Sequence, residues 1–331
     1  MSWQTQVERV GELVPLARLH PAVLAWAGKR RATAAWGVAL SGGVDSLALL
    51  LLLRAHFPQR KLLALHFNHR LRGRASKLDA VFCVRVCRAL GVPCVVGRWR
   101  SPPKPASAGA ARVARHSFFA RALKKFRTKH LWLAHQQDDI AESMLMRLAR
   151  GSGTGGLAAP RPVQVMTDGR VYLRPLLTLK KAELATALTQ SGLKWREDAS
   201  NAANDHFRNR VRRSVLPAWI KAAGRDALAG AALARELLDD DDAALEAWLD
   251  ELAPLDRRNQ LSLGRLKGKP VALVRRALHR WLLAVRPETD LSRQGFNQLL
   301  AAVERGRDTR FSLGAKGFAV VRRGQLKFQR A

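Results

Sequence analysis

The feature that most constrains this fold is a regular alternation of short apolar runs and amphipathic helical patterns that begins near residue 35. The strand-like runs cover 35–40, 62–67, 93–96 and 131–134, and the helical patterns cover 46–55, 76–90, 110–125 and 138–150. Strands that alternate with helices of this length form βαβ units, which place their strands parallel in one sheet. The sequence therefore predicts an α/β fold, with a parallel sheet and helices on both of its faces. Ligands bind to such sheets beyond the carboxyl ends of the strands.

The pattern changes near Pro217, after a glycine-rich linker at 151–156, a short strand, a helix at 179–191 and a basic segment. Helical patterns follow at 222–252, 271–285 and 291–304, and short strand-like runs at 311–313, 319–321 and 325–328. We therefore predict a first domain over 1–217 and a smaller, mainly helical domain over 218–331 that ends in short strands.

The chain carries a large positive charge, with 58 Lys and Arg against 26 Asp and Glu, a net charge of +32. Such a surplus repels itself, and a polyanionic partner, most commonly nucleic acid, is the usual reason for it. The first ten residues contain no basic segment leading into an apolar stretch, so a secretory signal is not expected. The longest apolar run, 47–53, is too short to cross a bilayer. These features predict a cytoplasmic protein without a membrane partner.

Three cysteines, Cys83, Cys87 and Cys94, are too few and too irregularly spaced for a disulfide framework. Cys83 and Cys87 lie one helical turn apart, which would suit half of a zinc site, but no second pair completes one. We interpret all three as buried small apolar residues.

A glycine-containing loop, SGGVDS at 41–46, lies between a strand-like run and an amphipathic helix. Two glycines allow a tight turn that exposes backbone N–H groups, and these groups form an anion site together with the helix N-terminus. A carboxylate at position 45 repels phosphate unless it holds a Mg²⁺ ion that bridges the phosphates. The loop lacks the Gly-Lys-Ser/Thr of the Walker motif. A simple turn with Asp45 or Ser46 as helix cap is the alternative. The predicted nucleotide-binding residues are Ser41, Gly42, Gly43, Val44, Asp45 and Ser46.

This loop resembles the PP-loop of the N-type ATP pyrophosphatases, whose Rossmann-like domains cleave ATP between the α and β phosphates and adenylate an oxygen of the acceptor. That superfamily includes synthetases of GMP, NAD and asparagine, tRNA thiolation enzymes and tRNA(Ile)-lysidine synthetases. The resemblance implies ATP and Mg²⁺ as cofactors, with Asp45 as the metal ligand. The loop alone does not select one of these activities.

A second string, AHQQDDIAES at 134–143, follows a strand-like run and opens a helix. Asp139 and Glu142 are three residues apart and share one helix face. Acidic residues in a first turn also suit the helix dipole, so capping is the alternative interpretation. The basic string FRNRVRR at 207–213 packs four guanidinium groups into six positions, which suits a phosphate-binding surface or, alternatively, a solvated helix face.

These strings resemble those of the tRNA(Ile)-lysidine synthetases, together with LHFNHRLR at 65–72, RPLL at 174–177 and EDASN at 197–201. The resemblance covers about residues 35–217 and continues more weakly over 291–328. The chain departs from the usual pattern at Ala108 and His116, where the family has Glu and Tyr, and at Ala199, where proline is usual.

The resemblance implies a role for each matching residue. The catalytic residues would be Asp45, Arg112, Asp139 and Glu142; His66 and His135 would contact the nucleotide; and Arg70, Arg72, Arg115, Arg208, Arg210, Arg212 and Arg213 would bind RNA. Asp139 would act on the lysine amine, and Arg112 would steady phosphate or RNA.

The implied reaction joins free lysine to C2 of the wobble cytidine, C34, of the isoleucine tRNA with a CAU anticodon. ATP adenylates the base, AMP and pyrophosphate leave, and codon specificity changes from AUG to AUA. A homodimer is one possible assembly.

Three alternatives stay open on sequence grounds. A tRNA thiolase would need catalytic cysteines or an iron–sulfur cluster, and the three cysteines lack that arrangement. A synthetase acting on a small molecule would need an ammonia source and would leave the charge of +32 without a purpose. A basic RNA-binding protein with a decayed nucleotide site is the third.

Overall fold

The computed structural model describes residues 2–29, 35–103, 105–197, 207–285, 291–314 and 317–331. The chain forms two compact units, Met1–Asp239 and Asp240–Ala331. The long helix α11 (Ala227–Leu252) contains the division between the units. Each unit has its own hydrophobic core and is described separately below.

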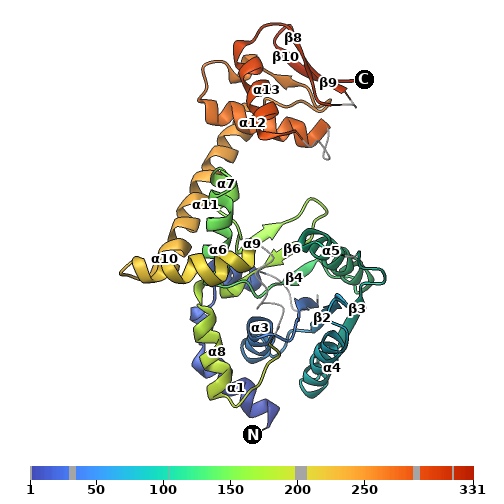
Figure 1. Ribbon diagram of the computed structural model, residues 1–331, viewed down its shortest axis with the longest axis vertical. Coiled ribbons are helices and arrows are strands. Elements are labelled where there is room, and N and C mark those ends of the chain that lie inside the picture. The colour runs from blue at the N-terminus through green and yellow to red at the C-terminus, as the bar shows by residue number, and fades with distance from the viewer. Residues whose placement is uncertain (1, 30–34, 104, 198–206, 286–290, 315–316) are drawn as a thin grey trace. The chain divides into compact units, whose positions relative to one another are not determined.

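A six-stranded sheet forms the centre of the first unit (Figure 1), in the order β3-β2-β1-β4-β6-β5. Its strands are β1 (Trp36–Ala39), β2 (Leu62–Asn68), β3 (Cys94–Arg98), β4 (His130–Trp132), β5 (Val163–Val165) and β6 (Val171–Leu173). All neighbouring pairs are parallel except β5 with β6. The predicted α/β class and the four strands of the alternating region are confirmed. The antiparallel edge strand β5 was not predicted, because three residues carry too little pattern.

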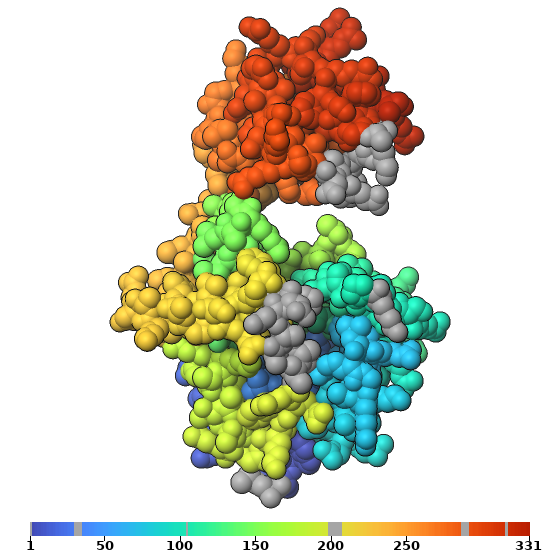
Figure 2. Space-filling model, in the orientation of Figure 1, coloured from blue at the N-terminus to red at the C-terminus, as the bar shows by residue number. Residues whose placement is uncertain are grey.

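Helices cover both faces of this sheet, as predicted, and alternate residues of β2 show the division. Leu62 and Ala64 pack with α3 (Val44–His56) and α4 (Arg74–Ala89) on one face. Leu63 and Leu65 pack with α5 (Ala108–Lys125) on the other. Successive side chains of a strand point to opposite faces, so one strand contributes to two cores. In the space-filling view, α4 (cyan) and α5 (teal) both reach the surface of this unit (Figure 2).

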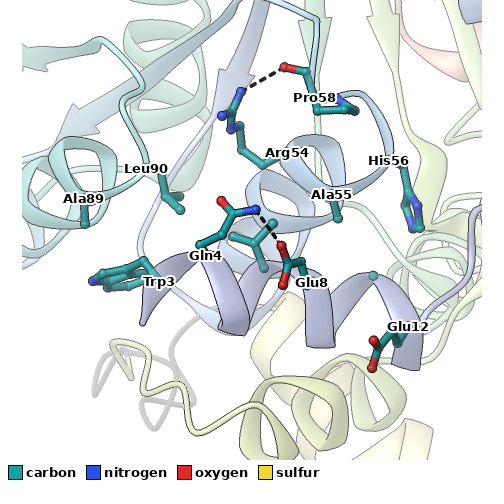
Figure 3. A pocket seen from close by; sticks show the side chains of 12 residues that line it. Trp3, Gln4, Glu8, Glu12, Arg54, Ala55, His56, Pro58, Ala89 and Leu90 are labelled. Atoms are coloured by element: carbon teal, nitrogen blue, oxygen red, sulfur yellow. Dashed lines mark hydrogen bonds between the residues drawn. The ribbon is translucent and has the colours of Figure 1, made fainter. Parts of the chain in front are cut away.

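Helix α3 is buried almost all round, since α1 (Trp3–Leu13) and α8 (Lys181–Gln190) cover the side that faces away from the sheet. The N-terminal helices α1 and α2 (Pro21–Gly28) were not predicted from the sequence. Gly11 lets α1 approach α3 closely, because a Cβ at this position would lie 2.9 Å from the Ala55 Cβ. A cavity of about 600 Å³ remains beside this contact, between α1 and the C-terminal ends of α3 and α4 (Figure 3).

The basic segment before Pro217 is helical. It comprises α9 (Phe207–Arg210), the π-helical turn η4 (Val211–Val215) and α10 (Leu216–Ala222). Proline lacks an N–H donor and clashes with the preceding turn of a regular α-helix, and a widened turn relieves this conflict. Leu216 packs with Ile140 of α6 (Gln137–Leu148) and Leu228 of α11. The predicted boundary at 217 thus falls within the first unit, which extends to Asp239.

The second unit packs α12 (Val271–Val285) and α13 (Arg293–Arg305) against a four-stranded antiparallel sheet. The sheet order is β7-β10-β9-β8, with β7 (Leu261–Ser262), β8 (Thr309–Ser312), β9 (Gly317–Arg322) and β10 (Gln325–Arg330). Buried Trp281 donates its indole N–H to the Asn259 carbonyl at 3.0 Å. The helices and three terminal strands match the sequence prediction, and β7 adds a strand that it missed.

The remaining short elements are η1 (Leu16–Arg18), α7 (Thr154–Leu157), η2 (Pro175–Thr178) and η5 (Gly264–Leu266). Among the described parts of the chain, no helix combines the length and apolar character that a membrane crossing requires.

Candidate functional site

The sheet reverses its direction of growth between β1 and β4, because β2 and β3 lie on one side of β1 whereas β4 and β6 lie on the other. Loops that leave neighbouring strands at such a point turn away from each other and open a crevice at the carboxyl ends of the strands. The SGGVDS loop follows β1, and His135 and α6 follow β4. The fold therefore places the two strongest sequence motifs side by side.

The Ser46 hydroxyl organises the loop from its centre. Its oxygen accepts hydrogen bonds from the backbone N–H groups of Ser41 and Gly42, at 3.1 and 3.2 Å, and its proton is directed to the Gly43 carbonyl at 3.1 Å. The Ser41 hydroxyl lies 2.9 Å from the same oxygen. Ser46 is buried and Ser41 is exposed. Ser46 thus fixes the curvature of the loop, while Ser41 remains accessible to a ligand.

Position 42 requires glycine for two reasons, its backbone conformation and its close contact with α4. Its φ is +92°, in the region that favours glycine. A Cβ there would also lie 3.2 Å from both Cys83 Sγ and a Phe82 ring carbon on α4. Helix α4 therefore packs directly behind the loop, and Val44 begins α3 with a buried side chain.

Asp45 carries an unsatisfied carboxylate oxygen. Its Oδ1 is buried and has no hydrogen-bond partner among the described residues. Burial, followed by the neighbouring Asp139 carboxylate, raises the pKa of Asp45 to about 7. A carboxylate that is both desolvated and close to a second carboxylate is expected to attract a cation. Asp45 therefore fits the Mg²⁺ role that the sequence suggested. Three acidic, cysteine or histidine side chains do not converge as a metal site anywhere in the described chain, so other ligands would have to come from the nucleotide and water.

His66 lies near the end of β2, and its ring is held by the chain that leaves β1. Its Nδ1 is 2.9 Å from the Leu40 carbonyl, which can only accept, so Nδ1 carries the proton. Burial lowers the pKa of His66. The neutral ring therefore presents Nε2 as an acceptor, and this atom is buried without a partner among the described residues.

Helix α6 begins with a reciprocal capping arrangement. The Gln136 side chain accepts from the N–H groups of Asp138 and Asp139 at 2.6 and 3.3 Å, and Asp139 Oδ2 accepts from the Gln136 N–H at 3.1 Å. Asp138 Oδ2 accepts from the Lys181 N–H at 3.0 Å, which connects α6 to the start of α8. The capping interpretation of Asp139 is thus correct, and it leaves the other oxygen of Asp139 directed away from the cap.

Glu142 and Asp139 form an ion-pair cluster with two arginines of the basic segment. Glu142, with 1% of its side chain exposed, accepts from Arg208 Nε at 2.8 Å and Arg212 Nε at 2.5 Å. Arg208 also donates to Asp139 Oδ1 at 2.5 Å. A buried carboxylate requires such partners. Pairing between these two predicted groups was not foreseen, because nothing in the sequence indicates which of four close arginines turns inward.

The predicted RNA-binding arginines are therefore in different environments. Arg208 and Arg212 face the acidic pair, whereas Arg210 and Arg213 are exposed. The remaining three lie elsewhere: Arg70 is exposed in the turn after β2, Arg72 is paired with Asp79 at 2.8 Å, and Arg115 is half-buried on α5. Burial, followed by the charges of Arg112 and Arg208, lowers the pKa of Arg115.

Arg174 is a buried cation beside the site that sequence reasoning did not include. Its Nε donates to His135 Nδ1 at 3.1 Å, and its other donors reach the Arg161 carbonyl and the Gln164 side chain at 2.7 and 3.0 Å. Burial, followed by the charge of Arg112, lowers the pKa of Arg174 to about 10. His135 has a pKa well below its ordinary value, through burial and then Arg174. His135 is therefore neutral, and its free proton lies on Nε2. The RPLL string was the available signal.

The departures from the family pattern also have defined places. Ala108 is exposed at the start of α5, one residue after the N-cap Ser107. His116 lies two turns further along, and its Nδ1 is 3.2 Å from the Tyr172 hydroxyl. Burial and the surrounding arginines, Arg112 first, lower the pKa of His116 to about 4. Arg112, Arg115, Arg170 and Arg174 thus gather positive charge around His116.

Arg196 completes the phosphate loop from a distant part of the chain. Its backbone N–H donates to the Gly42 carbonyl at 2.9 Å, and its guanidinium pairs with Asp79 of α4 at 2.9 Å. Sequence reasoning missed this residue, which immediately precedes the EDASN string. Positions 198–201 of that string lie outside the described residues.

The three cysteines differ in burial and acidity, and a hydrogen bond with the Cys87 thiol lowers the pKa of Cys94. Cys83 and Cys87 are buried, as predicted, and Cys94 is half-buried. Burial raises the pKa of the Cys83 thiol, which makes its nucleophilic thiolate form scarcer.

A family model for the PP-loop domain matches residues 19–219, which include the glycine loop, the start of α6 and most of the basic segment. The chain therefore belongs to the PP-loop domain family, whose members bind ATP through this loop. Among curated proteins it is similar to tRNA(Ile)-lysidine synthases. The protein of that name from Geobacter sulfurreducens is 34% identical over 280 residues, which cover 79% of this chain and 57% of the relative. The protein of that name from Geobacillus kaustophilus is 32% identical over 304 residues, covering 86% and 64%.

A third such relative, from Bacillus subtilis, is 38% identical over 186 residues, covering 54% of this chain and 39% of its own length. The chain thus spans less than two thirds of the length of each of these relatives. Among solved structures, the U34-tRNA thiolase NcsA from Methanococcus maripaludis matches with a TM-score of 0.55 and 18% identity, covering 71% of this chain and 78% of the thiolase. That likeness supports the fold alone.

Proposed function

We propose that this protein ligates lysine to C2 of the wobble cytidine, C34, in the CAU anticodon of isoleucine tRNA, with ATP as the energy source. AMP and pyrophosphate leave, and the resulting lysidine changes codon specificity from AUG to AUA. One observation carries the proposal: the glycine loop with Asp45 and the helix start with Asp139 and Glu142 meet at the switch point of a PP-loop domain. The names of the relatives support this choice within the family.

The loop would hold the phosphates of ATP. Its N–H groups lie at the N-terminus of α3, where the helix dipole favours negative charge. Asp45 would hold Mg²⁺, which supplies charge neutralisation for the departing pyrophosphate. Neutral His66 offers an acceptor at Nε2, suited to a donor group of the nucleotide. Neutral His135 offers a donor on Nε2, suited to a phosphate or base oxygen.

The acidic pair would receive the lysine side chain. An amine attacks only in its neutral form, so a carboxylate that accepts its proton promotes the reaction. Asp139 is our candidate, because Oδ2 is committed to the helix cap whereas Oδ1 is held by an arginine that is itself partly exposed. Lysine would share or replace the contact of Arg208 with Oδ1. Glu142 would hold Arg208 and Arg212 in position beside Asp139.

The tRNA would be held by positive charge around this crevice. Arg112 and Arg115 on α5, and exposed Arg210 and Arg213, would bind RNA phosphates, and the second unit would contact other parts of the tRNA. The target cytidine must leave its stacked position to reach the adenylate, as in other enzymes that modify a base. The net charge of +32 suits such a partner.

The test is incorporation of labelled lysine into CAU-anticodon isoleucine tRNA with ATP and Mg²⁺, with pyrophosphate release followed in parallel. Lysine at C34 that disappears with Asp45→Ala would support the proposal. Pyrophosphate release without lysine would point to another nucleophile. If neither is seen with folded protein that binds ATP, the proposed reaction is wrong. An exposed substitution, Glu12→Ala, serves as the matched control.

A further inference from the structure

A pocket of about 490 Å³ opens beside the candidate site, on the side of the sheet that α5 covers. It lies at the carboxyl ends of β2 and β3 and includes two residues, Phe118 and Arg121, from the C-terminal half of α5. Its lining combines four arginines, two phenylalanines, a valine and a glycine: Arg70, Arg98, Arg100, Arg121, Phe67, Phe118, Val96 and Gly97. Among these lining residues, only Arg70 has a role proposed above, as one of the predicted RNA-binding arginines.

The wall of the pocket is aromatic. Phe67 and Phe118 stack with ring centroids 5.4 Å apart and ring planes inclined by 27°. Gly97 makes this packing possible, since a Cβ at that position would lie 2.4 Å from a Phe118 ring carbon. Phe118 is buried, whereas Phe67 remains partly exposed. A flat apolar surface therefore faces the cavity from the end of β2.

The rim of the pocket is positive. All four arginines are exposed, no carboxylate lines the cavity, and no described acidic residue forms an ion pair with any of them. Four guanidinium groups around one small cavity repel one another, and an anion relieves that repulsion. Guanidinium groups also bind phosphate through paired N–H donors. The charge of the pocket therefore matches a phosphate-bearing ligand.

Hydrogen bonds fix the conformation of the turn that carries Arg70. Asn68 accepts from the Arg70 N–H at 2.8 Å and donates to the Ser76 carbonyl at 2.9 Å. Arg70 has a φ of +59°, and its side chain donates to the Arg100 carbonyl at 3.4 Å. Arg70 is thus directed across the pocket towards the chain that leaves β3.

The pocket and the phosphate loop are separated by a short distance along one edge of the sheet. The loop follows β1, β2 lies next to β1, and β3 lies next to β2. Adjacent strands are about 4.8 Å apart, so the pocket begins roughly 5 to 10 Å from the line of β1. A nucleic-acid strand with one base at the loop can therefore place a neighbouring nucleotide here.

We propose that this pocket binds one single-stranded nucleotide of the RNA substrate, with its base against Phe67 and its flanking phosphates on Arg98 and Arg121. This rests on the proposed function for the identity of the RNA. Proteins bind unpaired nucleotides by combining aromatic stacking with positive charge, whereas paired RNA is recognised mainly by shape along the backbone. The flat aromatic wall favours the unpaired form. The pocket is separate from the glycine loop, so ATP does not require it.

The test compares RNA binding by two double variants of the full chain. Arg98→Ala with Arg121→Ala removes two charges from the pocket. Arg88→Ala with Lys124→Ala removes two exposed charges from α4 and α5 that do not line it. Binding of a fluorescent hairpin with a CAU anticodon loop is measured by anisotropy over a salt series, beside a duplex of the same stem. ATP binding is measured in parallel by calorimetry.

We expect the pocket variant to bind the hairpin at least tenfold more weakly, with its salt slope reduced by about 1.4, since each single-strand phosphate contact contributes roughly 0.7. The affinity for the duplex should decrease by the same small factor in both double variants. The affinity for ATP should be unchanged in both. Phe67→Leu, which keeps an apolar side chain but removes the flat ring, should also weaken hairpin binding without changing the salt slope.

The proposal would be overturned if both double variants lost the same affinity for the hairpin, or if the pocket variant lost the same affinity for hairpin and duplex. Either result would mean that only overall charge matters. Unchanged hairpin binding in the pocket variant would also overturn the proposal. The proposed reaction has a separate outcome: wild-type protein that binds the hairpin through this pocket but incorporates no lysine would refute the reaction and leave the pocket in place. If wild-type protein incorporates lysine but the pocket variant binds the hairpin normally, the reaction is supported and the pocket proposal is refuted.

Discussion

Arg212 and Glu142, seventy positions apart in the sequence, are in direct contact, with 2.5 Å between Arg212 Nε and the buried Glu142 Oε1. Glu142 lies on α6 at the candidate site, and Arg212 lies in the π-helical turn before Pro217. The contact therefore joins the acidic motif to the basic motif. Both motifs were visible in the sequence as separate functional signals.

Glu142→Ala should destabilise the first unit. Removal of one partner of a buried ion pair leaves the other charges uncompensated, which costs about 3–5 kcal/mol when both partners are buried. Arg208 and Arg212 are partly exposed, with 40% and 31% of their side chains accessible. Water therefore compensates some of the loss, and we expect a decrease of roughly 2 kcal/mol in the free energy of unfolding.

Urea unfolding followed by tryptophan fluorescence measures this decrease. Glu12→Ala breaks an exposed i,i+3 pair with Arg9 and should cost less than about 0.5 kcal/mol. Similar values for the two variants would show that the Glu142 cluster does not stabilise the fold.

Asp45→Asn should stabilise the protein at alkaline pH while it weakens binding of ATP with Mg²⁺. The folded-state pKa of about 7 lies above the ordinary 3.8, so the folded state holds this proton more tightly than the unfolded state. Wild-type stability contributed by this group is present below pH 4 and is lost as the pH rises to about 7. One pKa unit corresponds to about 1.4 kcal/mol, so the variant should gain roughly 2–4 kcal/mol at pH 8 relative to pH 4.

Urea unfolding of wild type and variant at pH 4, 6 and 8 gives the comparison, and calorimetry gives Mg²⁺-dependent ATP binding at pH 6 and 8. Wild-type binding should strengthen with pH as the carboxylate ionises. If the free energy of unfolding of the variant follows that of the wild type at all three pH values, the raised pKa of Asp45 is contradicted.

Ser46→Ala should lower the affinity for ATP. The substitution removes the acceptor shared by the N–H groups of Ser41 and Gly42, and a lost hydrogen bond costs about 1 kcal/mol. We expect an increase of roughly fivefold in the dissociation constant of ATP, since 1.4 kcal/mol corresponds to tenfold. Equilibrium dialysis with labelled ATP measures the change. Ser117→Ala, at an exposed position on α5, should leave it unaltered.

Gly42→Ala should impair the loop more severely than its size suggests. The φ of +92° strains any other residue by about 1–3 kcal/mol, and the new methyl group would also press on Cys83 and Phe82. We expect loss of measurable ATP binding and a fall of several degrees in the melting temperature. Gly28→Ala provides the comparison, because a Cβ there meets nothing within 4 Å; an equally large fall in that variant would count against the loop as the cause.

The central sheet could be predicted from the sequence because its strands and helices each carry a clear period. The four strands of the alternating region and the helices α3 to α6 follow from those periods and from the glycine loop. Helices α1 and α2 could not be predicted in the same way. The covering role of α1 depends on Gly11 fitting against Ala55, a contact between positions 44 residues apart that no local pattern encodes.

The sequence motifs of the candidate site could be predicted, but the ion pairs between their side chains could not. The loop, His66 and the start of α6 meet as the topology requires. The inward turn of Arg208 and Arg212, by contrast, depends on where a helix of the basic segment packs on α6. Arg174 was quoted in the RPLL string but given no role, and Arg196 was not singled out, because each is a single basic residue in a chain with 58 Lys and Arg.

The hydrogen bond from the Arg196 N–H to the Gly42 carbonyl has a consequence for how the protein is made. The loop lies near the beginning of the chain, but its conformation is completed by a residue translated 154 positions later. At synthesis rates of about 5–20 residues per second, the ribosome needs roughly 8–30 seconds to cover that interval. We expect a nascent chain arrested before Arg196 emerges to bind ATP poorly, and one arrested after it to bind well. Nucleotide binding would then mark the moment at which the loop reaches its final conformation.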